Sequence, residues 1–316
     1  MKAIVVSHPG GPEVLTYTDV PKPSVKSGWT LIAVRARGVN HSEIFTRDGE
    51  SPSVKFPRIL GIEAVGEVVT TTDAKRLPVG QVVVTFMGEM GRAYDGSYAE
   101  FALIPNEQLF PITTTLSWQD LAAVPETYYT AYGALEGLRL NDGETLMVRG
   151  GTSGVGVAAA KLAHAMADVT VTGSTRNLNK RDQLLAAGFD EVVLDRDGQL
   201  PPGSRYDKIL ELIGAATVPE SLQHLNPGGI VSATGELGGQ WGLNEFEPVA
   251  KIPSNTYLTA FSSGDISEQR LRAMLRLIET RHLDVRPVKV FPLREMRAAH
   301  EYLESQHSFG KVVVVS

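Results

Sequence analysis

The stretch LMVRGGTSGVGVAAAKLAHA, residues 146–165, constrains the fold more than any other part of the chain. A short apolar segment runs into glycines at positions 150, 151, 154 and 156, and alanine-rich sequence follows. A buried strand, a glycine turn and a helix in this order point free backbone N–H groups at a phosphate, and the helix dipole favours the negative charge. The missing side chains therefore predict a turn with room for a pyrophosphate group.

The G-x-G-x-x-G/A pattern of dinucleotide-binding turns fits this stretch in two registers. One register uses Gly154, Gly156 and Ala159, and the other uses Gly151, Ser153 and Gly156 with a serine in the middle. A glycine-rich turn without a ligand remains the alternative, because the glycines alone do not distinguish the two. The candidate contacts at this turn are Gly151, Ser153, Gly154, Val155 and Gly156.

The segment about 20 residues further on bears on the choice of dinucleotide. An NAD-binding fold of this kind carries an Asp or Glu there for the ribose 2′-hydroxyl, but no acidic residue occurs between Val169 and Arg181. Ser174, Arg176 and Lys180 instead offer a hydroxyl group and two cations, which suit a 2′-phosphate. We expect NADPH as the cofactor; the alternative is that the two cations only begin a solvated helix.

The order of predicted elements indicates an α/β protein of two domains, as the length of 316 residues also suggests. Short β-like segments separated by Gly and Pro fill the first third of the chain, and strands then alternate with helices as in a doubly wound parallel sheet. The last strand, GKVVVVS, is expected to rejoin the first domain. We therefore expect a β domain over 1–115, a nucleotide-binding domain over 116–262, and a return to the first domain over 263–316.

Charge and composition exclude several classes of function. The net charge of −6 and the scattered Lys and Arg residues argue against a nucleic-acid partner. The apolar run at the N-terminus is too short for a signal peptide, and no later stretch has the length of a membrane span, so we expect a cytoplasmic protein without a membrane partner. The absence of cysteine excludes disulfides, thiol nucleophiles and zinc sites with thiolate ligands.

With these residues in view, the chain resembles the zinc-independent medium-chain dehydrogenases/reductases, in their quinone oxidoreductase branch. The resemblance covers nearly the whole length. It implies a GroES-like β domain, a Rossmann domain and a cofactor in the cleft between them. The segments that carry it are GVNHSEIF (38–45), GIEAVGEV (61–68), GSYAEF (96–101), AAVPETYYTAYGAL (122–135), RGGTSGVG (149–156), STRNLNK (174–180), LELIG (210–214), HLNPGGIVSATG (224–235) and GKVVV (310–314).

The resemblance also bears on metal binding. Zinc-using relatives have a cysteine at the position of Asn40 and a histidine at that of Ile62, and neither residue present here binds zinc. Glu63 and His41 alone make a poor tetrahedral site. We therefore expect no metal, and substrates that are already activated: a quinone, or alternatively an α,β-unsaturated carbonyl such as an alkenal or enoyl thioester.

The resemblance implies a role for individual residues. Asn40 would lie beside the nicotinamide and offer its amide to the substrate oxygen, and Thr130 would touch the cofactor. Related quinone reductases have a tyrosine where this chain has Phe45, so a hydroxyl group is lost. Further cofactor contacts are implied at Ile213, Gly235, Phe261 and Lys311, and the candidates for the substrate pocket are His41, Phe45, Ile62, Arg92 and Tyr94.

Several alternatives remain open from the sequence. His41 also fits a structural role, Lys311 fits a solvated strand end, and the loop with Arg92 and Tyr94 fits an ordinary surface loop. A non-catalytic NADPH-binding protein is the alternative to an enzyme. The strand TYLTAF (256–261) is expected at a sheet edge by family analogy, where pairing with a second copy would give a homodimer.

Overall fold

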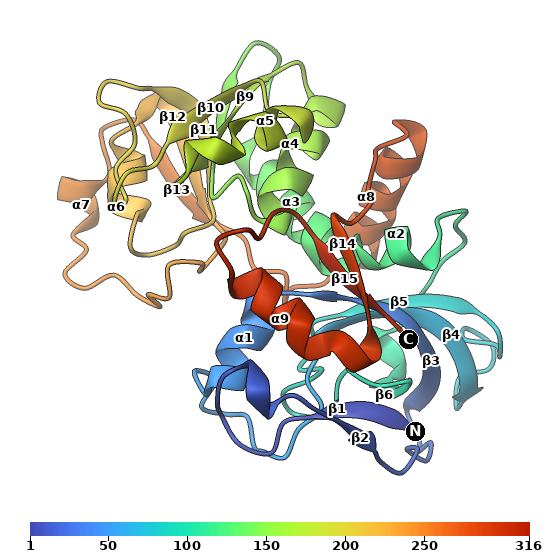
Figure 1. Ribbon diagram of the computed structural model, residues 1–316. Coiled ribbons are helices and arrows are strands. Elements are labelled where there is room, and N and C mark those ends of the chain that lie inside the picture. Colours follow the sequence, from blue (N-terminus) through green and yellow to red (C-terminus); the bar gives the residue numbers. More distant parts are fainter. The chain divides into compact units, whose positions relative to one another are not determined.

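The computed structural model describes residues 1–316, and the chain divides into two compact units (Figure 1). Unit 1 comprises Met1–Glu126 and Val285–Ser316, and unit 2 comprises Thr127–Asp284. No helix combines the length and the apolar character that crossing a membrane requires.

Unit 1 is built on a seven-stranded sheet. Its strands follow the order β14-β15-β3-β4-β5-β7, with β6 paired to β3, and β1 and β2 form a separate two-stranded sheet. The strands are β1 Lys2–Val5, β2 Thr16–Asp19, β3 Trp29–Val39, β4 Glu63–Thr71, β5 Val82–Phe86, β6 Phe101–Pro105, β7 Phe110–Pro111, β14 Lys289–Pro292 and β15 Val312–Val315. The helices are η1 Pro12–Val14, α1 His41–Asp48, η2 Asn106–Gln108, α2 Trp118–Ala122, η4 Leu293–Glu295 and α9 Met296–Glu304.

The end of the chain, Val285–Ser316, belongs to unit 1. Strand β15 pairs antiparallel with β3, so that Val312 lies opposite Val39. The first three of its four consecutive valines are fully buried, which is typical of β-branched residues in a strand covered on both faces. Helix α9 packs against β14 and β15, and its Met296 and Ala299 join the core that β1 and β15 also line.

Unit 2 contains a six-stranded parallel sheet of order β10-β9-β8-β11-β12-β13. Numbered within the unit this order is 3-2-1-4-5-6, the doubly wound Rossmann arrangement that the glycine turn and the alternating elements predicted. The strands are β8 Thr145–Arg149, β9 Thr170–Thr175, β10 Glu191–Leu194, β11 Tyr206–Glu211, β12 Leu225–Ala233 and β13 Tyr257–Ala260. The helices are α3 Pro125–Leu138, α4 Gly154–Met166, η3 Leu178–Lys180, α5 Arg181–Ala186, α6 Val218–Leu222, α7 Pro248–Lys251 and α8 Glu268–Thr280.

The boundaries between the units differ from those expected at 115/116 and 262/263. Helix α2 stays with unit 1 because it packs on β3, β4 and β15. The segment that contains α8 belongs to unit 2 because side chains of α3 form hydrogen bonds and an ion pair with it. The Tyr129 hydroxyl donates to the carbonyl of Asp265 over 3.0 Å and accepts from the Ser267 N–H over 2.7 Å, and Arg270 pairs with Glu136 at 2.7 Å. These side-chain contacts have no local sequence signature.

Candidate functional site

The glycine turn of unit 2 requires its glycines for two different reasons. Gly150 has a φ of +89°, in the left-handed region that disfavours side chains. Gly151 and Gly156 instead allow close approach. A Cβ on Gly156 would lie 2.6 Å from the carbonyl oxygen of Gly150, and one on Gly151 would lie 3.2 Å from the Cα of Gly173. The turn between β8 and α4, here called the glycine cradle, is therefore closely packed at Gly151 and Gly156.

Two residues predicted to contact the cofactor, Ser153 and Ser174, form hydrogen bonds to the backbone of the turn itself. Ser153 is the N-cap of α4, and its Oγ accepts from the Gly156 N–H over 3.0 Å. Ser174, at 2% exposure, accepts from the Gly150 N–H through its Oγ and from the Gly151 N–H through its carbonyl, both over 3.1 Å. The helix then begins at Gly154. These bonds leave Ser153 and Ser174 a clear positioning role, and their contact with a cofactor stays a prediction.

The two cations predicted beyond β9 lie near one another. Arg176 is exposed and Lys180 ends the short helix η3. Burial lowers the pKa of Lys180, and the positive charge of Arg176 lowers it further. Two like charges close together repel each other, so this end of the sheet favours an anion.

The remaining predicted cofactor residues of unit 2 lie at close contacts between elements. Phe261 packs on Gly133, where a Cβ would come within 2.1 Å of the ring, and Thr130 lies on the same helix, α3, at 9% exposure. Gly235 packs closely against Leu212, the residue that follows β11, since a Cβ on Gly235 would lie 2.3 Å from the carbonyl oxygen of Leu212. Ile213, next along the chain, begins the loop held at this point.

A buried glutamate, Glu211, holds that loop; it lies in the segment LELIG (210–214), but no role was predicted for it. Glu211 is fully buried; its Oε1 accepts from the N–H of Ile213 over 2.8 Å and its Oε2 accepts from Ser221. The Nη1 of Arg149, also fully buried, lies 3.7 Å from Oε2. Burial raises the pKa of Glu211, although the charge of Arg149 opposes the rise. The one sequence signal for this network is that Arg149 and Glu211 each end a strand, β8 and β11.

Unit 1 contains a compact polar group formed by Asn40, Glu63 and Lys311, here called the Asn40 cluster. The Lys311 ammonium donates to Glu63 Oε1 over 2.6 Å and to Asn40 Oδ1 over 2.7 Å. Asn40 Nδ2 donates to Glu63 Oε1 over 2.9 Å, and the N–H of Glu126 donates to Glu63 Oε2 over 3.0 Å. Glu63 is fully buried and Lys311 is 6% exposed. The cluster is thus a buried ion pair with an amide bonded to both of its members.

These partners fix the orientation of the Asn40 amide. An ammonium group only donates, so the amide oxygen of Asn40 must face Lys311 and the amide nitrogen must face Glu63. The nitrogen carries two hydrogens, and the bond to Glu63 uses one. The second N–H forms no hydrogen bond within the protein, and Asn40 is only partly buried.

Close packing of the backbone makes room for the cluster. A Cβ on Gly38 in β3 would lie 2.1 Å from Glu63 Oε1 and 2.5 Å from Lys311 Nζ. The φ of Gly38 is not in the left-handed region. This glycine is therefore required for space, because any larger residue would displace the ion pair.

A second buried carboxylate, Glu43, positions Asn40, and the sequence reasoning missed it. Its Oε2 accepts from the N–H of Asn40 over 2.8 Å and its Oε1 accepts from the N–H of Ile62 over 3.0 Å. Burial raises the pKa of Glu43 to about 7. Asn40 and Glu43 form a capping box at the start of α1, and the N-x-x-E spacing was the signal that could have revealed it.

The other pocket candidates near Asn40 have distinct environments. His41 begins α1, and burial lowers its pKa to about 4, so its imidazole is neutral at pH 7. Ile62 is buried at 4% exposure and has an apolar side chain. Phe45 is partly exposed on α1. The structure brings Ile62 and Asn40 together through Glu43 and leaves the roles of the three candidates as predictions.

The structure separates Tyr94 from this group. The Tyr94 hydroxyl donates to the carbonyl of Gly88 over 3.1 Å and to the side chain of Gln108, and its ring meets Trp29 edge-on at 5.1 Å. Tyr94 lines a cavity to which no member of the Asn40 cluster contributes. Arg92, on the same loop, has a buried Nε without a hydrogen-bond partner. Any role of these two residues as a lid over substrate stays a prediction.

Two family models match the chain. Residues 26–114 match the alcohol dehydrogenase GroES-like domain, and residues 187–314 match a domain described as zinc-binding dehydrogenase. The residues of the Asn40 cluster do not fit a zinc ion. The Lys311 ammonium is bonded to Asn40 Oδ1 and Glu63 Oε1, the oxygens that a metal would need, and Ile62 provides no ligand atom.

Full-length relatives and a solved structure agree with these matches. Quinone oxidoreductase from Lama guanicoe is 32% identical, and that from Rattus norvegicus is 30% identical; each alignment covers 100% of this chain and 97% or 98% of the relative. A mycobacterial protein complexed with NADPH superimposes with a TM-score of 0.84, 25% identity and full coverage of both chains. With its GroES-like unit and its Rossmann unit, the chain belongs to the quinone oxidoreductase branch of the medium-chain dehydrogenase/reductase family of oxidoreductases.

Proposed function

We propose that this protein is an NADPH-dependent oxidoreductase that transfers a hydride to a quinone or a similarly activated acceptor without a zinc ion. The observation that carries the proposal is the Asn40 cluster, in which a buried ammonium and a buried carboxylate hold an amide with one N–H left to donate. The 30% and 32% identical quinone oxidoreductases support the choice of acceptor class.

The glycine cradle and the cations beyond β9 support NADPH as the cofactor. Gly150, Gly151 and Gly156 allow the tight turn between β8 and α4, and a turn of this kind at the start of a helix is where a pyrophosphate group binds in dinucleotide-binding folds. Arg176 and Lys180 provide two positive charges for a 2′-phosphate. The bound cofactor supplies the hydride. The NADPH complex of the mycobacterial relative is consistent with this assignment.

Asn40 has the chemistry to assist reduction of an activated acceptor. A quinone already has an electrophilic site, and it gains negative charge on oxygen as the hydride arrives. A preorganised donor aimed at that oxygen stabilises the developing charge. The free N–H of Asn40 is such a donor, and the Lys311 ammonium on the amide oxygen strengthens it by polarising the amide. Neutral His41 adds no competing positive charge.

Steady-state kinetics with a panel of acceptors tests the proposal. Wild-type protein is assayed for NADPH oxidation with naphthoquinones, ortho-quinones, alkenals and enoyl thioesters. Asn40→Ala is expected to lower kcat with quinone by about 100-fold, the cost of losing one oxyanion donor, with little change in the KM for NADPH. Asn40→Asp is the matched control for size. Turnover with alkenals or enoyl thioesters but not with quinones would show that the acceptor is an α,β-unsaturated carbonyl. NADPH binding without turnover of any acceptor would refute enzymatic function.

The cofactor assignment has its own test. Arg176→Ala/Lys180→Ala is expected to weaken NADPH at least tenfold more than NADH, because a charge-assisted contact contributes about 1.5–3 kcal/mol. Arg196→Ala/Lys251→Ala, which removes two exposed cations elsewhere in unit 2, serves as the control. Calorimetry supplies both dissociation constants. An unchanged ratio of NADPH to NADH affinity would reverse the assignment.

A further inference from the structure

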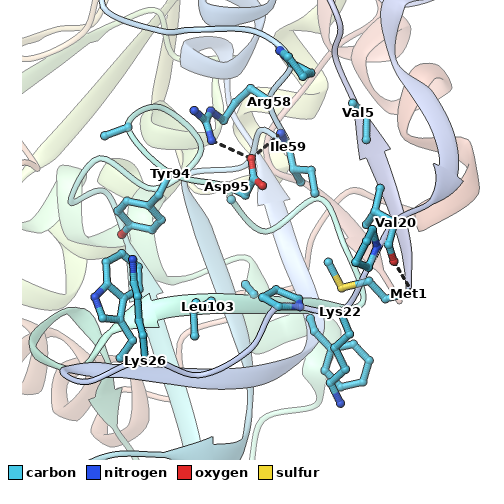
Figure 2. Close-up of a pocket in the computed structure, with 18 residues that line it drawn as sticks. Met1, Val5, Val20, Lys22, Lys26, Arg58, Ile59, Tyr94, Asp95 and Leu103 are labelled. Carbon is cyan, nitrogen blue, oxygen red and sulfur yellow. Dashed lines mark hydrogen bonds and ion pairs between the residues drawn. The ribbon is translucent and has the colours of Figure 1, made fainter.

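A cavity is lined entirely by residues of unit 1, and it is independent of the proposed function (Figure 2). Its volume of about 550 Å³ is in the range of small-molecule sites. The walls come from the loop that leads into β3, from residues 57–59 and 93–96, and from β6. No member of the Asn40 cluster and none of the residues of α1 line it.

Two lysines at this cavity each lie over an aromatic ring. The Lys22 ammonium is 3.7 Å from the ring centroid of Phe101, and the Lys26 ammonium is 3.8 Å from that of Trp29. Trp29 in turn meets Tyr94 edge-on. The rings hold the two ammonium groups at cation–π distance. Neither lysine forms an ion pair with a carboxylate, and both are exposed, so their N–H groups can bind an anion.

The one acidic side chain in the lining is already neutralised. Asp95 accepts from Arg58 Nη1 over 2.8 Å and from the N–H of Ile59 over 3.1 Å, as Figure 2 shows. The lining therefore carries the uncompensated positive charge of Lys22 and Lys26, in a chain whose net charge is −6. This local charge favours an anionic ligand over a neutral or cationic one.

The walls between the charges are apolar. The lining includes Ile59, Leu103 and the prolines at 21, 23 and 57, together with the aromatic rings of Trp29 and Tyr94, which meet edge-on. The two lysines do not lie at the same end. Trp29 pairs with Pro105 and Ala33 pairs with Phe101, so the two rings that support the lysines are separated along the strands. An anionic head group can bind at either end while an apolar body fills the space between.

We propose that this cavity binds a small amphiphilic carboxylate, with an alkyl or aromatic body against Leu103 and Trp29 and its head group on Lys22 or Lys26. Because the cavity has the volume of a small-molecule site and is lined by residues of one unit only, the ligand is a free small molecule. The site is separate from that of the hydride acceptor, so both can be occupied at once.

Fluorescence of Trp29 tests the proposal directly. The chain has three tryptophans, so full-length Trp118→Phe/Trp241→Phe protein reports on Trp29 alone. Decanoate is titrated beside decanol and decyltrimethylammonium, with and without NADPH. The expected result is a saturable change with decanoate, weaker or absent with the other two and unaffected by NADPH. Removal of the lysine that holds the head group is expected to weaken decanoate about tenfold.

The variants separate this site from any other. Lys22→Ala, Lys26→Ala and the double variant are compared with Lys55→Ala/Lys75→Ala, which removes two exposed lysines of unit 1 outside the cavity. Loss in the double variant with retention in the control supports the proposal. Equal binding of decanol and decanoate, equal binding by the double variant and the control, or an unresponsive Trp29 at millimolar decanoate would each overturn it. All of these outcomes are independent of acceptor turnover.

Discussion

Replacing Lys311 by methionine tests the Asn40 cluster most directly. Methionine is unbranched and one atom shorter than lysine but carries no charge, so it leaves the carboxylate of Glu63 buried without its cation. Removing one partner of a buried ion pair costs about 3–5 kcal/mol. Glu63 would keep its bonds from Asn40 Nδ2 and the Glu126 N–H, so we expect a loss at the lower end, about 3 kcal/mol. The same change removes the cation from the amide oxygen of Asn40 and should lower kcat.

The assay is urea unfolding of unit 1, followed by the fluorescence of Trp29 and Trp118 in a Trp241→Phe background. With an m-value of about 2 kcal/mol per molar urea, a loss of about 3 kcal/mol moves the midpoint by about 1.5 M. Adding Glu63→Gln to Lys311→Met should recover part of the loss, because the unpaired charge is gone. A loss below about 1 kcal/mol, or no recovery in the double variant, would refute the idea that the pair is coupled.

Three further predictions concern space, pH and assembly. Gly38→Ala is expected to lower both kcat and the unfolding midpoint, since its Cβ would come within 2.1 Å of Glu63 Oε1; wild-type values for both would contradict the close packing. Burial lowers the pKa of His300 to about 3, so between about pH 6 and pH 4 the unfolded chain binds a proton that the folded chain does not. The free energy of unfolding should therefore fall as the pH is lowered, and His300→Gln should reduce that slope by up to about 1.4 kcal/mol per pH unit; an equal slope in both proteins would argue against it. Strand β13 lies at the edge of its sheet with Tyr257 60% exposed, and we expect a homodimer by light scattering that Tyr257→Lys converts to monomer; a monomeric wild type would exclude it.

The architecture could be predicted because each helix, strand and turn has a recognisable pattern within a short stretch of sequence. Alternating strands and helices define the Rossmann unit, and the glycines at 150, 151 and 156 mark the turn between β8 and α4. The run of valines at 312–315 predicts a buried strand for the same reason, although its pairing with β3 is a long-range contact. The unit boundaries were less accessible, because they depend on contacts such as that of Tyr129 with Asp265, which come from residues far apart in sequence.

The candidate site was predictable residue by residue but not as a network. Asn40 and Lys311 were both identified from the resemblance, yet nothing in the sequence placed a lysine from the end of the chain on an amide 271 positions earlier. Glu63 was weighed only as a metal ligand, and its role as the partner of Lys311 depends on the pairing of β3 with both β4 and β15. Long-range strand pairing decides these contacts, and local patterns do not report it.

The discontinuity of unit 1 has a consequence for how the protein is made. Unit 2 is a continuous segment, Thr127–Asp284, and it can fold as soon as it has left the ribosome. Unit 1 must wait for Val285–Ser316, because β15 inserts between β14 and β3 and brings Lys311 to Asn40. Lys311 of the Asn40 cluster is therefore synthesised only after the whole of unit 2, and a nascent chain without β15 exposes the open edge of β3 and lacks the ion pair with Glu63.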